Sequence, residues 1–296
     1  MRFSYPNSGL PVRLVAPVMA LFVLAAACSA DEDDPGAGAF IDEGATLVVA
    51  NSPGTVSVNG PQRIMVALVG EGPNAYFGAP NEPADLTFTA PDGDTAETVR
   101  AQYLATDGVA LGLYVAEVSF GAVGRWTVAI EGTESGAGRT QIDVAAESVV
   151  PEAGDPAPPS QTPTAATPEE VAAISTDPEP DPAFYQLSIA EAVANGRPTV
   201  VAFATPAFCQ TALCGPTIET VKEVVGDNDD IDVVHVEPFD IAQARTGSLA
   251  PVAAMFEWQL VSEPWVFVIN EDGVVTASFE GTIGAEELDT AVSALG

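Results

Sequence analysis

The chain has 296 residues, which is enough for about two domains of ordinary size. It carries 42 Asp and Glu residues against 9 Lys and Arg residues, giving a formal net charge of −33. A chain this acidic repels nucleic-acid phosphates, so we expect no nucleic acid among its partners.

The first 28 residues predict an export signal. Arg2 and Arg13 precede the apolar run Leu14–Ala27, and Cys28 follows this run directly. The run is shorter than the roughly 20 residues that a membrane-spanning helix needs. The small residues before Cys28 resemble the bacterial lipobox, which implies that residues 1–28 are a lipoprotein signal peptide and that Cys28 is lipidated. We therefore expect an exported protein, anchored to the cell membrane outside the cytoplasm; a plain secretory signal is the alternative.

Residues 29–39 are acidic and Gly-rich, and they predict a flexible tether. Residues 40–148 hold seven or eight short runs with period-2 alternation, separated by turn sequences such as NSPG and PDGD. This pattern predicts an all-β sandwich. The stretch GLYVAEVSFGAVGRW resembles the small Ig-like domains of the FixH/YtkA type, which implies an Ig-like β-sandwich.

Residues 149–180 are rich in Pro, Ala, Thr and acidic residues, and they predict a linker that acts as a semi-rigid spacer. Residues 181–296 change character and predict a mixed sheet with helices on both faces. The expected order is helix, strand, helix, strand, helix, strand, strand, helix, at Ser188–Gly196, Pro198–Ala204, Pro216–Val225, Ile231–Glu237, Ala250–Trp258, Pro264–Asn270, Val274–Glu280 and Ala285–Leu295.

The segment TPAFCQTALCGP contains Cys209 and Cys214 directly after a buried strand. Together with FEWQLVSEPWVFVINEDGVV and the final AEEL helix, it resembles a thioredoxin-fold thiol–disulfide oxidoreductase over roughly residues 184–296. The resemblance implies an α/β thioredoxin-like domain with Pro264 as a cis-proline facing the cysteines. The expected fold class is therefore two domains, an all-β Ig-like sandwich followed by an α/β thioredoxin-like fold. The expected function is extracytoplasmic thiol–disulfide exchange with protein thiols or disulfides.

The cysteine spacing is C-x4-C, where the family has C-x2-C. Alignment on the strand makes Cys209 the attacking residue, whereas alignment on Cys-Gly-Pro makes it Cys214. Residues five apart in an ideal helix have Cα atoms about 8–9 Å apart, and a disulfide needs less than about 7 Å. A bridge therefore requires the segment between the cysteines to be looped.

His235 is the only histidine. Its imidazole titrates near neutral pH, so His235 is a candidate proton shuttle or thiolate partner. The competing interpretation is a buried histidine whose ring is satisfied by hydrogen bonds within the strand.

Three other functions stay open at this stage. The C-x4-C spacing resembles one class of peroxiredoxins, which would make the protein a peroxidase. The cysteine pair with His235 resembles the copper site of Sco-type proteins. The pair could also be a structural disulfide in a non-catalytic binding module. We predict no cofactor.

Overall fold

A computed structural model describes residues 45–70, 76–77, 83–105, 112–133, 136–226 and 228–295. The predicted signal peptide, Cys28 and the acidic tether lie outside these residues. The two sheets described below belong to one unit, Gly38–Gly296.

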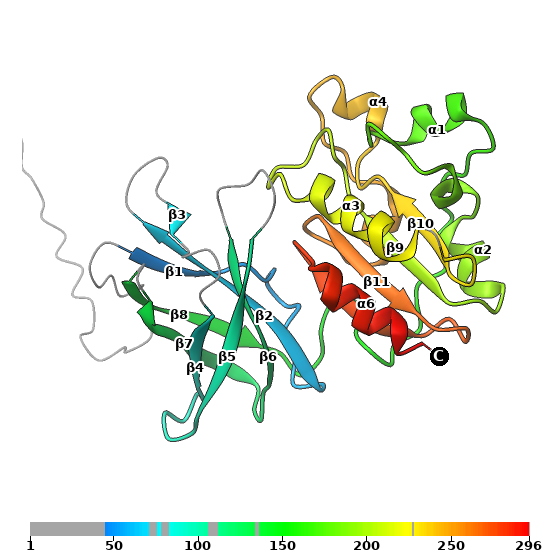
Figure 1. The fold of residues 1–296 in the computed structure, drawn as a ribbon. Helices are drawn as coiled ribbons and strands as arrows, with labels where there is room; N and C mark the ends of the chain where they lie inside the picture. The colour runs from blue at the N-terminus through cyan, green and yellow to red at the C-terminus, as the bar shows by residue number, and fades with distance from the viewer. Residues whose placement is uncertain are drawn as a thin grey trace, which may run out of the picture. The chain divides into compact units, whose positions relative to one another are not determined.

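The N-terminal part forms a single eight-stranded antiparallel sheet in the order β1-β2-β6-β5-β4-β7-β8, with β3 paired to β2 (Figure 1). Its strands are β1 (Ala45–Val49), β2 (Pro61–Gly70), β3 (Tyr76–Phe77), β4 (Ala84–Thr89), β5 (Ala96–Leu104), β6 (Leu113–Ser119), β7 (Gly124–Thr133) and β8 (Gly136–Val144). Alternate residues point inward to one apolar core, which includes Leu68, Phe88, Tyr114, Trp126 and Ile130.

Strand β5 decides the architecture of this part. Its residues Ala96–Ala101 pair with β4, and its last three residues, Gln102–Leu104, pair with β6. One strand thereby joins what would otherwise be two sheets. The end strands β1 and β8 also approach each other, because a Cβ atom added at Gly138 would lie 2.9 Å from Leu47 Cβ. The sheet is nearly closed and barrel-like, so the predicted Ig-like sandwich is wrong.

The second sheet has four strands in the order β10-β9-β11-β12: β9 (Thr199–Phe203), β10 (Asp232–Val236), β11 (Trp265–Ile269) and β12 (Val275–Glu280). Strands β9 and β10 are parallel, and β11 runs antiparallel to both β9 and β12. Strands β9 and β11 are buried along their whole length, as their continuous apolar sequences predict.

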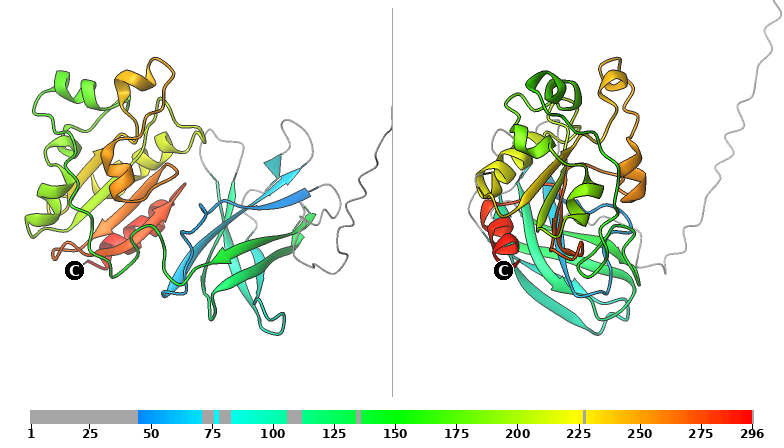
Figure 2. Two further views of the ribbon diagram at one scale, coloured as in Figure 1. Left: turned by 180° about the vertical axis from the view of Figure 1, so that it is seen from behind. Right: turned by 90° about the vertical axis from the view of Figure 1, so that its right-hand side faces the viewer.

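Short helices cover both faces of the second sheet. Helices α3 (Cys214–Val225) and α6 (Ala285–Ser293) lie side by side over one face (Figure 1). Helices α2 (Ile189–Ala194) and α5 (Ala253–Glu257) pack on the opposite face, which Figure 2 shows from behind. The remaining helices are α1 (Pro168–Ile174), α4 (Ile241–Ala244) and the 3-10 turn η1 (Pro182–Tyr185).

The predicted fold class is therefore wrong as a whole. The elements expected between 181 and 296 are present near their predicted bounds. However, the chain is mostly β, its helices span only 4 to 12 residues, and it shows no clear α/β thioredoxin-like fold. Within the part of the chain that the structure describes, no helix combines the length and the apolar character needed to cross a membrane.

The segment expected to be a linker packs against the second sheet. Ala157 N–H donates to the Gly273 carbonyl at 2.9 Å, and Val275 N–H donates to the Asp155 carbonyl at 2.9 Å. Helix α1 begins at a capping box formed by Thr167 and Glu170. Val171 on this helix is buried, as are Ala157 and Ala165 earlier in the same segment. The composition of the segment did not predict this packing, because backbone groups of Asp155 and Ala157 make these hydrogen bonds.

Candidate redox site

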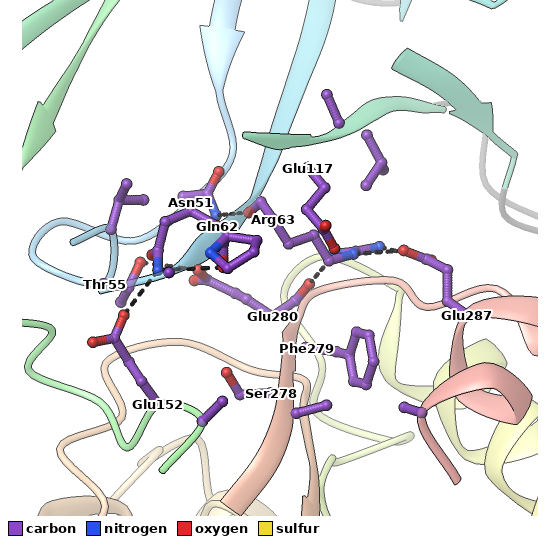
Figure 3. A pocket seen from close by; sticks show the side chains of 18 of the residues that line it. Asn51, Thr55, Gln62, Arg63, Glu117, Glu152, Ser278, Phe279, Glu280 and Glu287 are labelled. Carbon is purple, nitrogen blue, oxygen red and sulfur yellow. Dashed lines mark hydrogen bonds and ion pairs between the residues drawn. The ribbon is translucent and has the colours of Figure 1, made fainter. Parts of the chain in front are cut away.

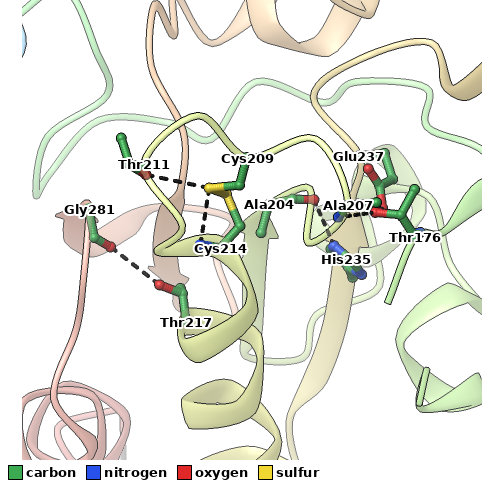
Figure 4. Close-up of a disulfide and its surroundings, with 10 residues drawn as sticks. All are labelled: Thr176, Ala204, Ala207, Cys209, Thr211, Cys214, Thr217, His235, Glu237 and Gly281. Carbon is green, nitrogen blue, oxygen red and sulfur yellow. Dashed lines mark hydrogen bonds between the residues drawn. A yellow bond between two sulfur atoms is a disulfide. The ribbon is translucent and has the colours of Figure 1, made fainter. Parts of the chain in front are cut away.

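Cys209 and Cys214 are joined by a disulfide at the start of α3 (Figure 4). Their Cα atoms are 6.0 Å apart, within the range that a disulfide spans. The residues between them form turns rather than helix, and Ala212 adopts a left-handed conformation with φ of 61°. The expectation that a bridge needs a looped segment is confirmed.

The two cysteines have different surroundings. Cys214 is fully buried, whereas Cys209 is partly exposed. The backbone N–H of Cys214 donates to Cys209 Sγ at 3.2 Å, and the Thr211 hydroxyl lies 3.4 Å from the same sulfur. Cys209 Sγ therefore occupies the acceptor position at the helix N-terminus, where the helix dipole and N–H donors stabilise negative charge.

Helix α3 starts two residues earlier than the sequence indicates. Pro216 is its third residue rather than its first, and Cys214 takes the first position. The N-cap residue, Leu213, offers no side-chain acceptor. The sulfur of Cys209 takes the place of a capping oxygen, and this explains how the helix can begin at Cys214.

The Glu263–Pro264 peptide bond is cis, as the sequence predicts. The Pro264 carbonyl accepts a hydrogen bond from Gly281 N–H at 2.8 Å, and the Gly281 carbonyl accepts one from the Thr217 hydroxyl at 3.5 Å. Thr217 lies in the first turn of α3, close to Cys214 in Figure 4. These contacts tie the cis-proline segment to the end of the helix that carries the disulfide.

His235 lies on β10 and is buried, with both ring nitrogens engaged. Since the Ala204 carbonyl can only accept, Nε2 donates to it at 2.9 Å, and Nδ1 accepts from the Tyr185 hydroxyl at 2.7 Å. Burial lowers the pKa of His235, so the neutral imidazole is favoured. The ring thereby fixes Ala204, the residue that directly follows β9 and leads into the cysteine loop.

A second contact anchors the same loop further along. Ala207 N–H donates to the Thr176 hydroxyl oxygen at 3.1 Å, and the Thr176 hydroxyl donates to Glu237 Oε1 at 2.7 Å. The other carboxylate oxygen of Glu237 is buried and has no hydrogen-bond partner among the described residues. Sequence reasoning missed this anchor, because Thr176 lies in the segment expected to be a spacer and no motif marks it.

The aromatic residues Trp258, Trp265 and Phe208 differ in how far their side chains are buried. Trp258 and Trp265 are buried, and their indole N–H groups donate to Ser160 at 3.1 Å and to Ser262 at 3.0 Å. Both tryptophans are therefore core residues. Phe208 is partly exposed beside Cys209.

A cavity of about 1310 Å³ lies away from the cysteines, between β2, β12 and α6 (Figure 3). Several of the polar side chains that line it are paired with one another or with neighbouring groups. Arg63 binds Glu287 at 2.8 Å, and Glu280 accepts from Ser52 N–H at 3.0 Å and from the Ser262 hydroxyl at 2.8 Å. These pairings link residues of the first sheet to β12 and α6.

Among the described residues, no group of three or more His, Cys, Asp or Glu side chains is placed to hold a metal ion. A scan of protein-family models finds no match to the chain, and searches of curated proteins and of solved structures find no significant similarity.

Proposed function

We propose that the protein catalyses thiol–disulfide exchange through Cys209 and Cys214. The observation that carries this proposal is the asymmetry of the pair: Cys209 is partly exposed and its Sγ faces the Cys214 N–H and the Thr211 hydroxyl, while Cys214 is fully buried. A purely structural bridge has no need of one partly exposed cysteine at a helix N-terminus. The resemblance of the cysteine segment to thiol–disulfide oxidoreductases supports the same function.

This asymmetry favours Cys209 as the attacking residue. In the reduced protein, the Cys209 thiolate attacks a sulfur of a substrate disulfide, forms a mixed disulfide and expels one substrate thiolate, which takes up a proton. Cys214, deprotonated, then attacks Cys209 Sγ and expels the second substrate thiol. The substrate disulfide is reduced and the Cys209–Cys214 bond is restored; a thiol donor must reduce it for another turnover.

The surrounding residues position the loop rather than exchange electrons. His235 holds Ala204, and Thr176 holds Ala207, so both contacts fix the path of the chain towards Cys209. Pro264 directly precedes β11 and is linked through Gly281 to Thr217 in the first turn of α3, where it would limit how a substrate polypeptide approaches.

The place of action is part of the same proposal. The signal-like N-terminus with Cys28 supports export and lipid anchoring, and an oxidising compartment suits a reversible cysteine pair. The partners would be exported proteins with thiols or disulfides. The high negative charge of the chain disfavours nucleic acid as a partner.

The test is trapping of the mixed disulfide. The Cys214→Ser variant, reduced and mixed with a disulfide-containing protein such as insulin, should accumulate a covalent complex through Cys209, while Cys209→Ser should not. The wild-type protein with a thiol donor should reduce insulin in repeated turnovers.

Two results would overturn the proposal. One is the absence of any covalent complex with Cys214→Ser under conditions in which its Cys209 is alkylated by iodoacetamide. The other is loss of folded structure on mild reduction of the wild type, measured by circular dichroism, because that identifies a structural disulfide.

A further inference from the structure

Residues 280–282, at the end of β12, are bound by the first, eight-stranded sheet on one side (Figure 3). Arg63 of β2 donates to the carbonyls of Glu280 at 3.1 Å and Thr282 at 2.9 Å. The buried Glu280 carboxylate accepts from Ser52 N–H at 3.0 Å and from the Ser262 hydroxyl at 2.8 Å, and the two serine hydroxyl oxygens lie 2.9 Å apart. Strand β2 and the loop before it therefore hold both residues 280–282 and the segment that leads to the cis-proline.

The same residues meet the cysteine end of α3 on their other side (Figure 4). Gly281 N–H donates to the Pro264 carbonyl at 2.8 Å, and the Thr217 hydroxyl donates to the Gly281 carbonyl at 3.5 Å. A Cβ atom added at Gly281 would lie 3.5 Å from Met65 Sδ of β2 and 4.0 Å from Cδ1 of Leu213, the N-cap residue of α3. A side chain of the first sheet and a side chain of the cysteine loop therefore lie against the same glycine.

The path of the cysteine loop depends on the disulfide. Cys209 and Cys214 are five residues apart, so their bond closes a short ring. Within this ring Ala212 adopts a left-handed conformation with φ of 61°, which is unfavourable for a residue with a Cβ atom. Such a conformation persists only where the surrounding structure imposes it. The disulfide is one such restraint, and Leu213 is the next residue along the chain.

We propose that the contact of the first sheet with residues 280–282 is coupled to the redox state of the cysteine pair. In the disulfide form, Leu213 lies against Gly281 together with Met65. In the dithiol form, Ala212 relaxes and draws Leu213 away, and the contact weakens while both sheets stay folded. Coupling between two sites is reciprocal, so a change that weakens the contact makes the disulfide easier to reduce by the same factor. The inference requires a reducible disulfide but no exchange with a protein substrate.

The experiment equilibrates the full-length Met65→Ala variant with dithiothreitol. Reduction breaks the S–S bond and forms two thiols, while dithiothreitol gives up two electrons and two protons and becomes a cyclic disulfide. Met65 is only 1% exposed, and truncation removes its contact with Gly281. The equilibrium constant for disulfide formation should fall about 3- to 10-fold relative to the wild type, where tenfold corresponds to about 30 mV towards a more oxidising potential.

The matched control is Val66→Ala. Val66 is the next residue of β2, but its side chain belongs to the interior core of the first sheet. This substitution weakens the first sheet without removing a side chain that lies against Gly281, so the equilibrium constant should match that of the wild type.

Amide hydrogen exchange of the wild type gives a second measurement, which stands even if Met65→Ala does not fold. Reduction should speed exchange in residues 280–282 but not in β4, a strand of the first sheet that does not contact them. The coupling is refuted by an unchanged equilibrium constant in folded Met65→Ala, by an equal fall in Val66→Ala, or by identical exchange in the two redox states. Absence of a mixed disulfide would overturn the proposed function and leave both readouts unchanged, so the two proposals fail separately.

Discussion

At the scale of single residues, hydrogen bonds decide which side chains can take part in chemistry. His235 looked suited to proton transfer because its ordinary pKa is near neutral. In the structure, Tyr185 and Ala204 occupy both ring nitrogens, and burial favours the neutral ring. His235 therefore serves the site by fixing the start of the cysteine loop.

A lowered pKa for His235 predicts a pH-dependent stability. The unfolded chain protonates this histidine below its ordinary pKa of 6.5, while the folded chain resists protonation, so stability is full above that pH and declines as the pH falls. The decline is at most about 1.4 kcal/mol per pH unit for one proton, and the nearby carboxylates of Glu237 and Asp177 offset part of it.

Urea unfolding at about pH 7.5 and about pH 5.5 measures this effect. When the pH falls from the higher to the lower value, the free energy of unfolding of the wild type should decrease more than that of His235→Asn, which has no ionisable ring. An equal loss in both proteins would show that His235 does not titrate on unfolding in this range.

At the scale of elements, strand pairing decides the architecture of the N-terminal part. Period-2 alternation shows which residues face the core, but it does not name a strand's neighbours. Because β5 pairs with β4 over Ala96–Ala101 and with β6 over its last three residues, the expected pair of sheets becomes a single one. Close contact between β8 and β1 then nearly closes it, and Gly138 permits that contact.

Gly138→Ala should therefore destabilise the protein by about 1–3 kcal/mol. The new Cβ would lie 2.9 Å from Leu47 Cβ and 3.1 Å from the Leu47 backbone nitrogen, so the two strands must move apart. Gly121→Ala is the matched control, because no atom lies within 4 Å of its added Cβ. Denaturant unfolding gives both values; equal stability of the two variants would contradict the close approach of β1 and β8.

At the scale of the whole molecule, polar contacts join the two sheets. Arg63 on β2 binds Glu287 of α6 at 2.8 Å and donates to the carbonyls of Glu280 at 3.1 Å and Thr282 at 2.9 Å. Its side chain is only 14% exposed, so these bonds are poorly replaced by water. The two sheets should therefore unfold together.

Arg63→Ala should lower the free energy of unfolding by about 1–3 kcal/mol and separate the thermal transition into two. Arg125→Ala is the comparison, since the side chains of its ion pair with Asp143 are 59% and 74% exposed. The loss there should stay within about 1 kcal/mol. Differential scanning calorimetry distinguishes the outcomes: one unchanged transition in Arg63→Ala would mean that Arg63 does not couple the sheets.

The sequence by itself determined the local features. Continuous apolar runs identified the buried strands β9 and β11. The resemblance of FEWQLVSEPWVFVINEDGVV to a thioredoxin-fold segment implied that Pro264 is a cis-proline, and the Glu263–Pro264 bond is cis. The cysteine spacing showed that any bridge between Cys209 and Cys214 needs a loop, because helical geometry cannot bring them close enough.

Only the tertiary structure decided which distant segments of the chain contact one another. It joined the N-terminal strands into one sheet, so the predicted fold class was wrong. It also left Cys209 partly exposed while burying Cys214 completely. Such relations depend on which distant segments meet, whereas local propensity and spacing constrain only neighbours along the chain.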